Sequence, residues 1–557
     1  MRILASSAAA VLLLAGLCWL LLPPEAARLT LEPALGDPVR GAFHVHTRRS
    51  DGSGTIAEVA AAAARVGLDF VVITDHGDGT ASGEPPTYVG GVLVIDAVEI
   101  GGDGGHVVAL GMPTAPYPFG GETRDVVEDV QRMGGLAIAA HPTSSREQLR
   151  WTAWEAPIDG LEWINGDSQW RDEPLPALAG ALLTYPVRRA ATLTALLDRP
   201  EETLRRWDEL TRRRPVVGLA AGDAHARVLA VLKVPAYEQV FRMMSIALPD
   251  VVFGGNARED SRAVVSAIRD GRVYSTVDGL AGPGVLVFEA TQAEASAVAG
   301  GRLPAGEPVT VRVASNAPPG ARVVLLADGA VVDESDGARL EFVDPAGESR
   351  AYRAEVHLSG AGGGSRVPWV VSNPIYIGFE EEPSAPSTAA DTDEEAEEEP
   401  LAILYGDEQM AAWHVEQSSR SQSALDEVPA PGGTQLLLRW GLGGTISEGP
   451  FVALVTAAGS PGVDTARLRF TGRAERPMRL SVQVRTSDGL RWHRSVYLDA
   501  ETRVVDVALA DMRPREPGVT GPPVARDVRD LLFVVDTVNA ALGSNGQVWV
   551  DEVRLVP

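Results

Sequence analysis

The chain has 557 residues, of which 45% are hydrophobic and 22% are charged. This length exceeds one ordinary domain and the composition is typical of folded protein, so we expect two to four folded units rather than a disordered chain. The formal net charge of −26 argues against nucleic acid as a partner, because an acidic protein repels phosphate backbones.

Residues 1–27 contain an uncharged apolar run from Ile3 to Leu22. As a helix this run would be roughly 30 Å long, enough to cross the hydrocarbon core of a bilayer. We therefore predict a transmembrane anchor or signal segment, and a protein of a bacterial-type cell envelope whose domains lie outside the cytoplasm. A cleaved signal peptide that releases a secreted protein is one alternative, and a lipoprotein attached through Cys18 is another.

Strand-like and helix-like stretches alternate over residues 41–283, which predicts an α/β unit with a parallel sheet. The predicted strands are residues 41–47, 68–74, 92–100, 106–111, 136–140, 160–165 and 216–221. The predicted helices are residues 55–66, 124–133, 177–198, 201–213 and 261–270.

The helical period disappears beyond this unit. Short alternating runs between Gly and Pro turns predict an Ig-like β-sandwich over residues 284–379. Residues 380–400 hold ten acidic residues and no Lys or Arg, which is typical of a solvated linker. Residues 401–557 alternate again and predict a second β-sandwich of the jelly-roll type.

Polar side chains cluster at the ends of the predicted strands of the α/β unit. They are those of His44, His46, Asp51, Asp75, His76, Glu99, His106, His141, Asp223 and His225. Two residues apart on a strand, His44 and His46 should face the same side, as should Asp223 and His225. Since α/β sheets gather their sites at the carboxyl ends of strands, and imidazole and carboxylate are the ligands that divalent transition metals prefer, we predict a multinuclear metal site.

The order of these motifs resembles the PHP superfamily, named for polymerase and histidinol phosphatase. The resemblance covers about residues 41–275 and rests on His44-Val-His46, Ser50-Asp51-Gly52, Thr74-Asp75-His76, Glu99, Ala140-His141-Pro142 and Gly222-Asp223-Ala224-His225. The later segment Ser372-Asn373-Pro374-Ile375-Tyr376 is similar to the CehA/McbA branch of that superfamily.

This resemblance implies an α/β fold class, with a distorted (β/α)7 barrel followed by the two β-sandwich domains. It also implies two to three Mn, Zn or Fe ions per chain. Carried over residue by residue, the ligand sets are His44, His46, Glu99 and Asp223 for one metal, Glu99, His106 and His141 for a second, and Asp51, His76 and His225 for a third.

The implied activity is metal-dependent hydrolysis of a small, anionic ester, with a phosphoesterase as the leading interpretation. Hydrolysis of a carbamate, amide or carboxylic ester is the alternative, and a non-catalytic envelope-binding protein is the rival of another class. Glu99, as a ligand shared by two metals, is one candidate catalytic residue. Asp75 is the other, and it either orients His76 or caps a turn.

Candidate substrate-binding residues flank the predicted ligands. They are Arg48, Arg49, Arg227 and Asn165. A solvated arginine is the alternative for each of the three cations.

In residues 401–557 the ending Phe533-Val-Val-Asp536 and Gly546-Gln-Val-Trp549 is similar to carbohydrate-binding jelly rolls, so a carbohydrate is a further candidate partner. Trp413, Trp440 and Trp492 could stack on sugars, but we favour core positions for them.

Overall fold

The computed structural model describes most of the chain. The described residues are 15–31, 33–227, 235–360, 363–364, 366–379, 399–406, 409–410, 412–431, 433–459 and 465–557. Most of the predicted apolar span (residues 3–22) and of the predicted acidic linker (residues 380–400) lies outside these ranges. Contacts divide the chain into two compact units, Met1–Pro113 with Val126–Pro383, and Thr114–Asp125 with Ser384–Pro557. The domain boundaries inferred from the sequence stay predictions.

The prediction of a transmembrane helix is wrong for the described residues. Among them no helix is both long and apolar enough to cross a bilayer. Within the described part of the N-terminal run, residues 15–21 are helical.

One sheet of the first unit has five strands in the order β10-β9-β8-β7-β6. Their bounds are β6 Val98–Gly102, β7 Gly105–Leu110, β8 Leu136–Ala139, β9 Gly160–Asn165 and β10 Val217–Ala221. Strands β8, β9 and β10 are parallel, whereas β6, β7 and β8 pair antiparallel. The sheet is therefore mixed.

A second sheet of twelve strands extends through the rest of the first unit. Its main path is β16-β25-β21-β24-β12-β11-β2-β3-β5-β4, and β18 and β19 continue from β21. The bounds are β2 Val39–Val45, β3 Phe70–Ile73, β4 Thr87–Val89, β5 Val92–Asp96, β11 Ser245–Leu248, β12 Tyr274–Thr276, β16 Arg302–Leu303, β18 Arg322–Ala327, β19 Ala330–Asp336, β21 Arg350–His357, β24 Val370–Ser372 and β25 Ile375–Ile377. Only β2-β3, β3-β5 and β16-β25 are parallel in it.

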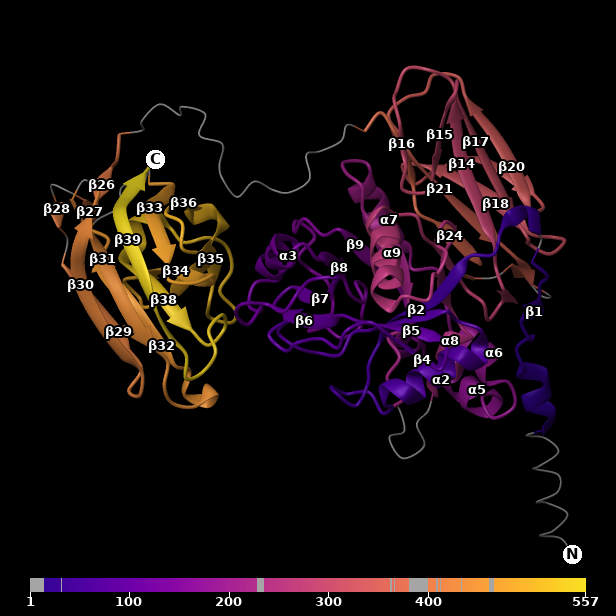
Figure 1. Cartoon of the computed structure of the whole chain (residues 1–557), viewed down its shortest axis with the longest axis horizontal. Helices are drawn as coiled ribbons and strands as arrows, with labels where there is room; N and C mark the ends of the chain where they lie inside the picture. The colour runs from indigo at the N-terminus through magenta and orange to yellow at the C-terminus, as the bar shows by residue number, and fades with distance from the viewer. Residues whose placement is uncertain are drawn as a thin grey trace, which may run out of the picture. The chain divides into compact units, whose positions relative to one another are not determined.

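The predicted fold class, an α/β protein with a (β/α)7 barrel, is wrong. The described residues contain 39 strands but eight complete α-helices, and strands β2 to β12 belong to two mixed sheets (Figure 1). A (β/α)7 barrel needs parallel neighbours joined by crossover helices, yet only two residues separate β6 from β7, which permits antiparallel pairing alone. The prediction of parallel pairing was wrong because buried strands are continuous apolar runs in both parallel and antiparallel sheets.

Short sheets and helices complete the first unit. The other strands are β1 Ala27–Arg28, β13 Ala281–Gly282, β14 Leu286–Gln292, β15 Ala295–Val298, β17 Val309–Ser315, β20 Arg339–Asp344, β22 Ser359–Gly360 and β23 Gly363–Gly364. The helices are α2 Ile56–Val66, α3 Thr123–Arg132, which crosses the boundary between the units, α4 Gly166–Arg171, α5 Leu175–Thr184, α6 Arg189–Thr194, α7 Glu201–Thr211, α8 Tyr237–Phe241 and α9 Ala257–Arg269. A 3-10 turn spans Pro33–Leu35.

Local sequence explains where two of these helices begin and end. Helix α2 starts at a capping box of Thr55 and Glu58 and ends at Gly67, whose φ of 75° suits a residue without a Cβ. The single helix predicted over residues 177–198 is instead split into α5 and α6. Pro186 lies in the gap, and proline can neither donate the helical hydrogen bond nor fit against the preceding turn.

The C-terminal part of the second unit consists mainly of two six-stranded sheets, β30-β31-β39-β33-β36 with β26, and β29-β32-β38-β34-β35-β37. The bounds are β26 Ala402–Ile403, β27 Tyr405–Gly406, β28 Gln409–Met410, β29 Trp413–Gln417, β30 Gln422–Ala430, β31 Gly433–Gly441, β32 Phe451–Ala457, β33 Arg467–Ala474, β34 Met478–Thr486, β35 Arg491–Leu498, β36 Arg503–Ala508, β37 Arg513–Pro514, β38 Val528–Asp536 and β39 Asn545–Val556. Trp440 and Trp492 are buried in the core and Trp413 packs against it, as the core interpretation predicted.

Asn373 ties the end of the first unit to a strand beneath the predicted site. Its side chain accepts from the backbone N–H of Gly218 in β10 at 2.7 Å and donates to the carbonyls of Gly218 at 3.0 Å and Val273 at 2.8 Å. The residue is 1% exposed, so the three backbone groups have no access to water. A side chain after β24 therefore holds β10 in place.

We expect Asn373→Ala to destabilise the first unit by about 3–5 kcal/mol, because it leaves three buried backbone groups unsatisfied. Asn256→Ala, which removes only the exposed N-cap of α9, should cost about 1 kcal/mol. Urea unfolding of both variants measures the difference. Equal losses would show that the bonds of Asn373 contribute no more than a surface cap.

Candidate metal centre

All nine predicted metal ligands lie in or just after strands of the first unit, where its two sheets meet. Val45 in β2 forms a parallel bridge with Ala224, which follows β10, and His76, which follows β3, bridges Glu99 in β6. These bridges connect the two outer strands of the five-stranded sheet, β10 and β6, with the ends of β2 and β3, which are interior strands of the twelve-stranded sheet. Strand ends from both sheets therefore deliver their side chains to one place.

The first group of ligands is His44, His46, Glu99 and Asp223. The Nε2 atoms of His44 and His46 lie 3.0 Å apart. Oε2 of Glu99 is 3.2 Å and 3.1 Å from these two nitrogens, and Oδ1 of Asp223 is 3.4 Å and 3.3 Å from them. Two ring nitrogens and two carboxylate oxygens thus point at a common centre.

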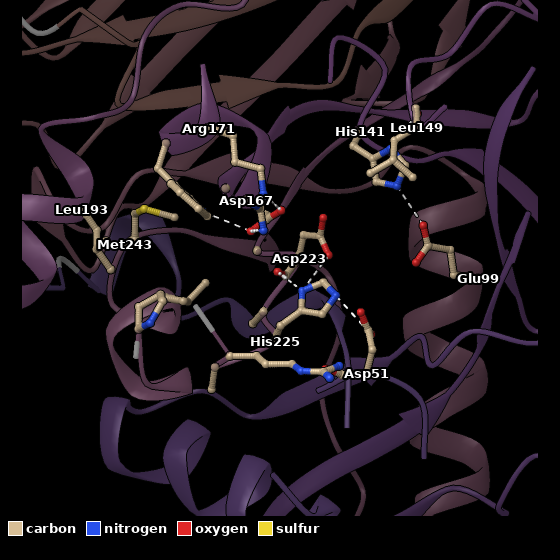
Figure 2. A pocket seen from close by; sticks show the side chains of 18 of the residues that line it. Asp51, Glu99, His141, Leu149, Asp167, Arg171, Leu193, Asp223, His225 and Met243 are labelled. Atoms are coloured by element: carbon tan, nitrogen blue, oxygen red, sulfur yellow. Dashed lines mark hydrogen bonds and ion pairs between the residues drawn. The ribbon is translucent and has the colours of Figure 1, made fainter. Parts of the chain in front are cut away.

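The second group of ligands is Glu99, His106 and His141. Oε1 of Glu99 lies 2.8 Å from Nδ1 of His106 and 2.8 Å from Nε2 of His141. The two oxygens of Glu99 therefore face different groups, so this carboxylate could be shared by two metals. Figure 2 shows His141 directed at this carboxylate.

The third group of ligands is Asp51, His76 and His225, together with the far side of His46. Oδ1 of Asp51 lies 3.2 Å from Nε2 of His225, 3.6 Å from Nδ1 of His46 and 3.7 Å from Nε2 of His76. The donor atoms of these four residues lie within 4.8 Å of one another. His46 thus faces two groups through its two ring nitrogens.

The backbone at this site adopts conformations that ordinary residues rarely take. His44, His141 and Asp223 have φ values of 64°, 34° and 47°. Such left-handed conformations of residues other than Gly cost of order 1–3 kcal/mol each and persist only where the surroundings enforce them. In β2 the pairing register also shifts between Ala42 and Val45, so the convergence of His44 and His46 does not come from regular strand alternation.

Two buried atoms of the site match the chemistry of a metal ligand. Oδ1 of Asp223 and Oδ1 of Asp51 accept no hydrogen bond within the described part of the chain. Each lies instead among ring nitrogens, where a buried carboxylate oxygen needs a cation. Six imidazoles and three carboxylates suit Zn, Mn or Fe, so the residues fit the metals that the sequence predicted.

Hydrogen bonds fix which nitrogen of each ring faces the centre. Nδ1 of His141 donates to the carbonyl of Leu149 at 2.9 Å, and Nδ1 of His225 donates to the carbonyl of Asp223 at 2.9 Å (Figure 2). Nδ1 of His44 donates to the carboxylate of Glu162. A ring that donates through Nδ1 keeps Nε2 for a metal, as is usual for metal-binding histidines.

Neighbouring carboxylates alter the proton affinity of two of these rings. Burial lowers the pKa of His141, but the hydrogen bond and the charge of Glu99 outweigh burial and raise that pKa to about 9. Burial also lowers the pKa of His225, and the charges of Asp223 and Asp51 raise it to about 9. Without metal, both rings are therefore protonated at neutral pH.

Asp75 stabilises the loop that carries the ligands instead of orienting His76. The Asp75 carboxylate accepts hydrogen bonds from the backbone N–H of Thr47 at 2.7 Å, from the hydroxyl of Thr47 at 2.5 Å and from the hydroxyl of Ser50 at 2.6 Å. Burial raises the pKa of Asp75, but these hydrogen bonds outweigh burial and lower it. Asp75 therefore caps a turn. This is the second of the two interpretations of Asp75 given by the sequence, the first being that it orients His76.

The predicted substrate contacts separate into different roles. Arg49 pairs with Asp75 at 3.0 Å and with Asp96, and Arg48 donates to the carbonyl of Ser53 at 2.8 Å. Neither of these arginines lines the cavity over the ligands. Asn165 bonds to other side chains of the site, whereas Arg227 does line the cavity and donates to the carbonyl of Asp51 at 2.9 Å.

A cavity of about 330 Å³ lies over the ligands. Ligand side chains form part of its lining. The lining also includes Arg146, Trp170, Arg171, Leu193, Leu197 and Met243. Arg171 is held by Asp167 and stacks over Trp170, 4.2 Å from the ring centroid (Figure 2). The lining thus combines polar ligand side chains with apolar and cationic side chains.

Sequence reasoning missed Glu162, Arg146 and Arg171. Glu162 is fully buried within the strand Gly160–Asn165, and an acidic residue in an otherwise apolar strand was the signal that could have found it. The two arginines lie in irregular or short helical segments with no periodicity, so nothing in the sequence distinguished them from solvated arginines.

Comparison with known proteins finds similarity in solved structures alone. No family model and no curated protein matches the chain. One similar structure is the family 11 carbohydrate-binding module of the cellulosomal cellulase Lic26A-Cel5E of Clostridium thermocellum, at 14% identity over 28% of this chain and 93% of the module, with a TM-score of 0.24. A CBM4 module (16%, 28% and 95%, TM-score 0.20) and an exo-beta-agarase (12%, 28% and 25%, TM-score 0.21) are also similar. At these values the likeness assigns neither activity nor ligand.

We expect Mn²⁺ to bind more tightly as the pH rises from 7 to 9. His141 and His225 have pKa values raised to about 9, and ligation requires the neutral ring. Protonation of these two rings stabilises the metal-free folded protein fully below about pH 6.5, and this stabilisation is lost as the pH rises through 9. At higher pH a metal therefore has fewer protons to displace from the rings. Each displaced proton should change the apparent Kd about tenfold per pH unit.

Titration calorimetry of the metal-free protein, in buffers of different ionisation enthalpy, counts the protons released. A Kd for Mn²⁺ that does not change between pH 7 and pH 9 would contradict the assignment of these histidines as ligands.

Proposed function

We propose that the first unit is a metal-dependent hydrolase with a di- or trinuclear centre. The observation that carries the proposal is the convergence of nine donor side chains, with Nε2 of His44 and His46 3.0 Å apart and Oδ1 of Asp223 beside both. A structural metal site is closed by its ligands, whereas this one opens into a cavity. An open site leaves room for a substrate.

Divalent metals in such a site polarise the scissile bond and lower the pKa of water. The residues of the chain would divide the remaining work. Glu99 would be shared by the first and second groups, which would fix the spacing between them, and His46 would belong to the first group. Asp75 would keep the loop from Thr47 to Asp51 in place through the hydrogen bonds to Thr47 and Ser50.

The cavity favours a small anionic ester with an apolar substituent. Arg146 and Arg227 place cationic groups beside the ligands, where they would neutralise the charge of a phosphate ester. Leu193, Leu197 and Met243 would cover the organic group. A phosphate ester is therefore the leading substrate, and a carbamate, amide or carboxylic ester is the alternative. Export of the protein stays a prediction.

We expect the purified full chain to hold two to three transition-metal ions and Glu99→Gln to lower turnover of an ester substrate by roughly 100-fold or more. The variant removes the negative charge that two groups share. Elemental analysis after expression with manganese, iron and zinc, together with a panel of phosphate, carboxylic and carbamate esters, measures both effects. His44→Ala combined with His46→Ala should lower the metal count.

Glu289→Gln is the matched control, because Glu289 lies on β14 away from the cavity, and it should leave both readouts unchanged. Less than about one metal per chain would remove the basis for the proposal. Full metal content without hydrolysis of any ester would favour a non-catalytic binding protein.

We also propose that the second unit binds carbohydrate, on the evidence of one sheet face. Trp549 in β39 lies between the inward-facing Val548 and Val550, so its ring is on the outer face of the sheet. The guanidinium of Arg473 stacks over this ring, 3.7 Å from its centroid. A half-buried aromatic ring beside charged side chains suits the alternating apolar and hydroxyl surfaces of a sugar.

We expect Trp549→Ala to weaken binding of a soluble mixed-linked β-glucan or β-1,4-galactan about tenfold, which corresponds to about 1.4 kcal/mol. Affinity electrophoresis of the full chain measures the change. Trp19→Ala, which removes a tryptophan of the first unit that is 79% exposed, is the control and should have no effect. If neither glycan retards the unmodified protein, carbohydrate binding at this face is contradicted for these polymers.

A further inference from the structure

Glu162 is the acidic residue beneath the metal centre that the ligand sets do not include. It lies in the middle of β9 and is 0% exposed. Its carboxylate accepts hydrogen bonds from Nδ1 of His44, from the backbone N–H of His141 at 2.7 Å and from Nδ2 of Asn165 at 2.8 Å. A buried carboxylate is costly unless such donors satisfy it, so each of its contacts matters.

The bond to His44 determines which nitrogen of that ring is available. Because Oε1 of Glu162 accepts from Nδ1, the proton lies on Nδ1. The Nε2 atom of His44 then faces Nε2 of His46 at 3.0 Å and Oε2 of Glu99 at 3.2 Å. The carboxylate thus orients the ring and selects the tautomer that can bind a metal.

The second oxygen of Glu162 acts on two further ligands. It holds the backbone N–H of His141, the residue whose φ of 34° is unusual for a side-chain-bearing residue. It also holds the amide of Asn165, which donates in turn to Oδ2 of Asp223 at 3.3 Å. Asp223 is thereby turned so that Oδ1 faces the ring nitrogens of the first group.

We propose that Glu162 is the positioning residue of the centre, setting the tautomer of His44 and the orientation of His141 and Asp223 through one carboxylate. The inference rests on the proposed function in that the three positioned residues are metal ligands. The placement of the proton on Nδ1 of His44, however, does not depend on any hydrolytic activity.

Glu162→Gln tests this role because only one orientation of the glutamine amide fits. Two donors face Oε2, the fixed backbone N–H of His141 and the amide of Asn165, whose own oxygen accepts from the N–H of Ser168. The glutamine oxygen must take that place, and its NH2 group then faces Nδ1 of His44. That ring must accept at Nδ1 and carry its proton on Nε2, the atom that faces the metals.

¹⁵N NMR of the full chain, labelled at the histidine rings, reads out the proton directly. In the metal-free protein we expect a hydrogen-bonded Nδ1–H signal of His44, assigned by its absence in His44→Ala, and its loss in Glu162→Gln. Zn²⁺ affinity of the variant should fall by about 10- to 100-fold, the usual effect of removing such a partner.

Asp159→Asn is the matched control. Asp159 is a half-buried residue one position before β9, and its carboxylate accepts from the N–H of Ala137 at 2.8 Å and from Gln131 at 3.1 Å, away from the ligands. Its asparagine variant should keep the His44 signal and the Zn²⁺ affinity. Glu162→Asp retains the charge with a shorter side chain and should bind Zn²⁺ better than Glu162→Gln.

The outcomes separate the two proposals. An Nδ1–H signal of His44 that persists in Glu162→Gln overturns the positioning role. Absence of this signal from the unmodified protein also overturns it, and this measurement does not depend on whether the variant folds. An unmodified protein that shows the signal but binds no Zn²⁺ contradicts the proposed function and leaves the hydrogen-bond assignment standing.

Discussion

The proposed metal site of the first unit depends on holding its donor groups within contact of one another. Six imidazoles and three carboxylates gather in neighbouring groups, and five of these nine residues are buried. Bringing such groups together is unfavourable unless protons or cations lie between them, because unpaired charges are poorly stabilised away from water. The rest of the unit must supply the free energy that holds them there.

That free energy comes from the two sheets on which the ligands are mounted. Phe70, Val72 and Leu219, in strands next to the ligands, are completely buried, so the strand ends cannot move apart without exposing the core. This packing enforces the left-handed backbone of His44 and Asp223. A site held in this way would need little rearrangement to bind the proposed metals, which would favour tight and selective binding.

The sequence predicted the convergence of these side chains better than it predicted the fold around them. Histidine and carboxylate at strand ends are local signals, and all nine residues converge as expected. The direction of strand pairing is not local, because apolar runs such as those of β6, β7 and β9 look alike in parallel and antiparallel sheets. Glu162 was missed for the same reason, since its donors come from His44 and His141, which are distant in sequence.

The arginines show a similar limit of sequence reasoning. Arg49 is adjacent to the ligand loop in sequence, yet it turns toward Asp75 and Asp96. Arg146, five residues after His141, lines the cavity instead. Proximity along a chain does not determine the direction of a long side chain, because its charged group moves to whichever carboxylate or solvent is near. Only the assembled fold distinguishes the two.

Ligands and cavity wall belong to different kinds of structure, and this separation has a consequence for specificity. The ligands lie at the ends of long-range paired strands, whereas Trp170, Arg171 and Leu193 come from the short helices α4 and α6. Short helices depend on packing for their stability and tolerate substitution on their exposed faces. Changes there would alter which organic group fits without moving His44, Glu99 or Asp223. In the proposed hydrolase, the sheets would thus fix the chemistry of the site, and the helices that line the cavity would determine the choice of substrate.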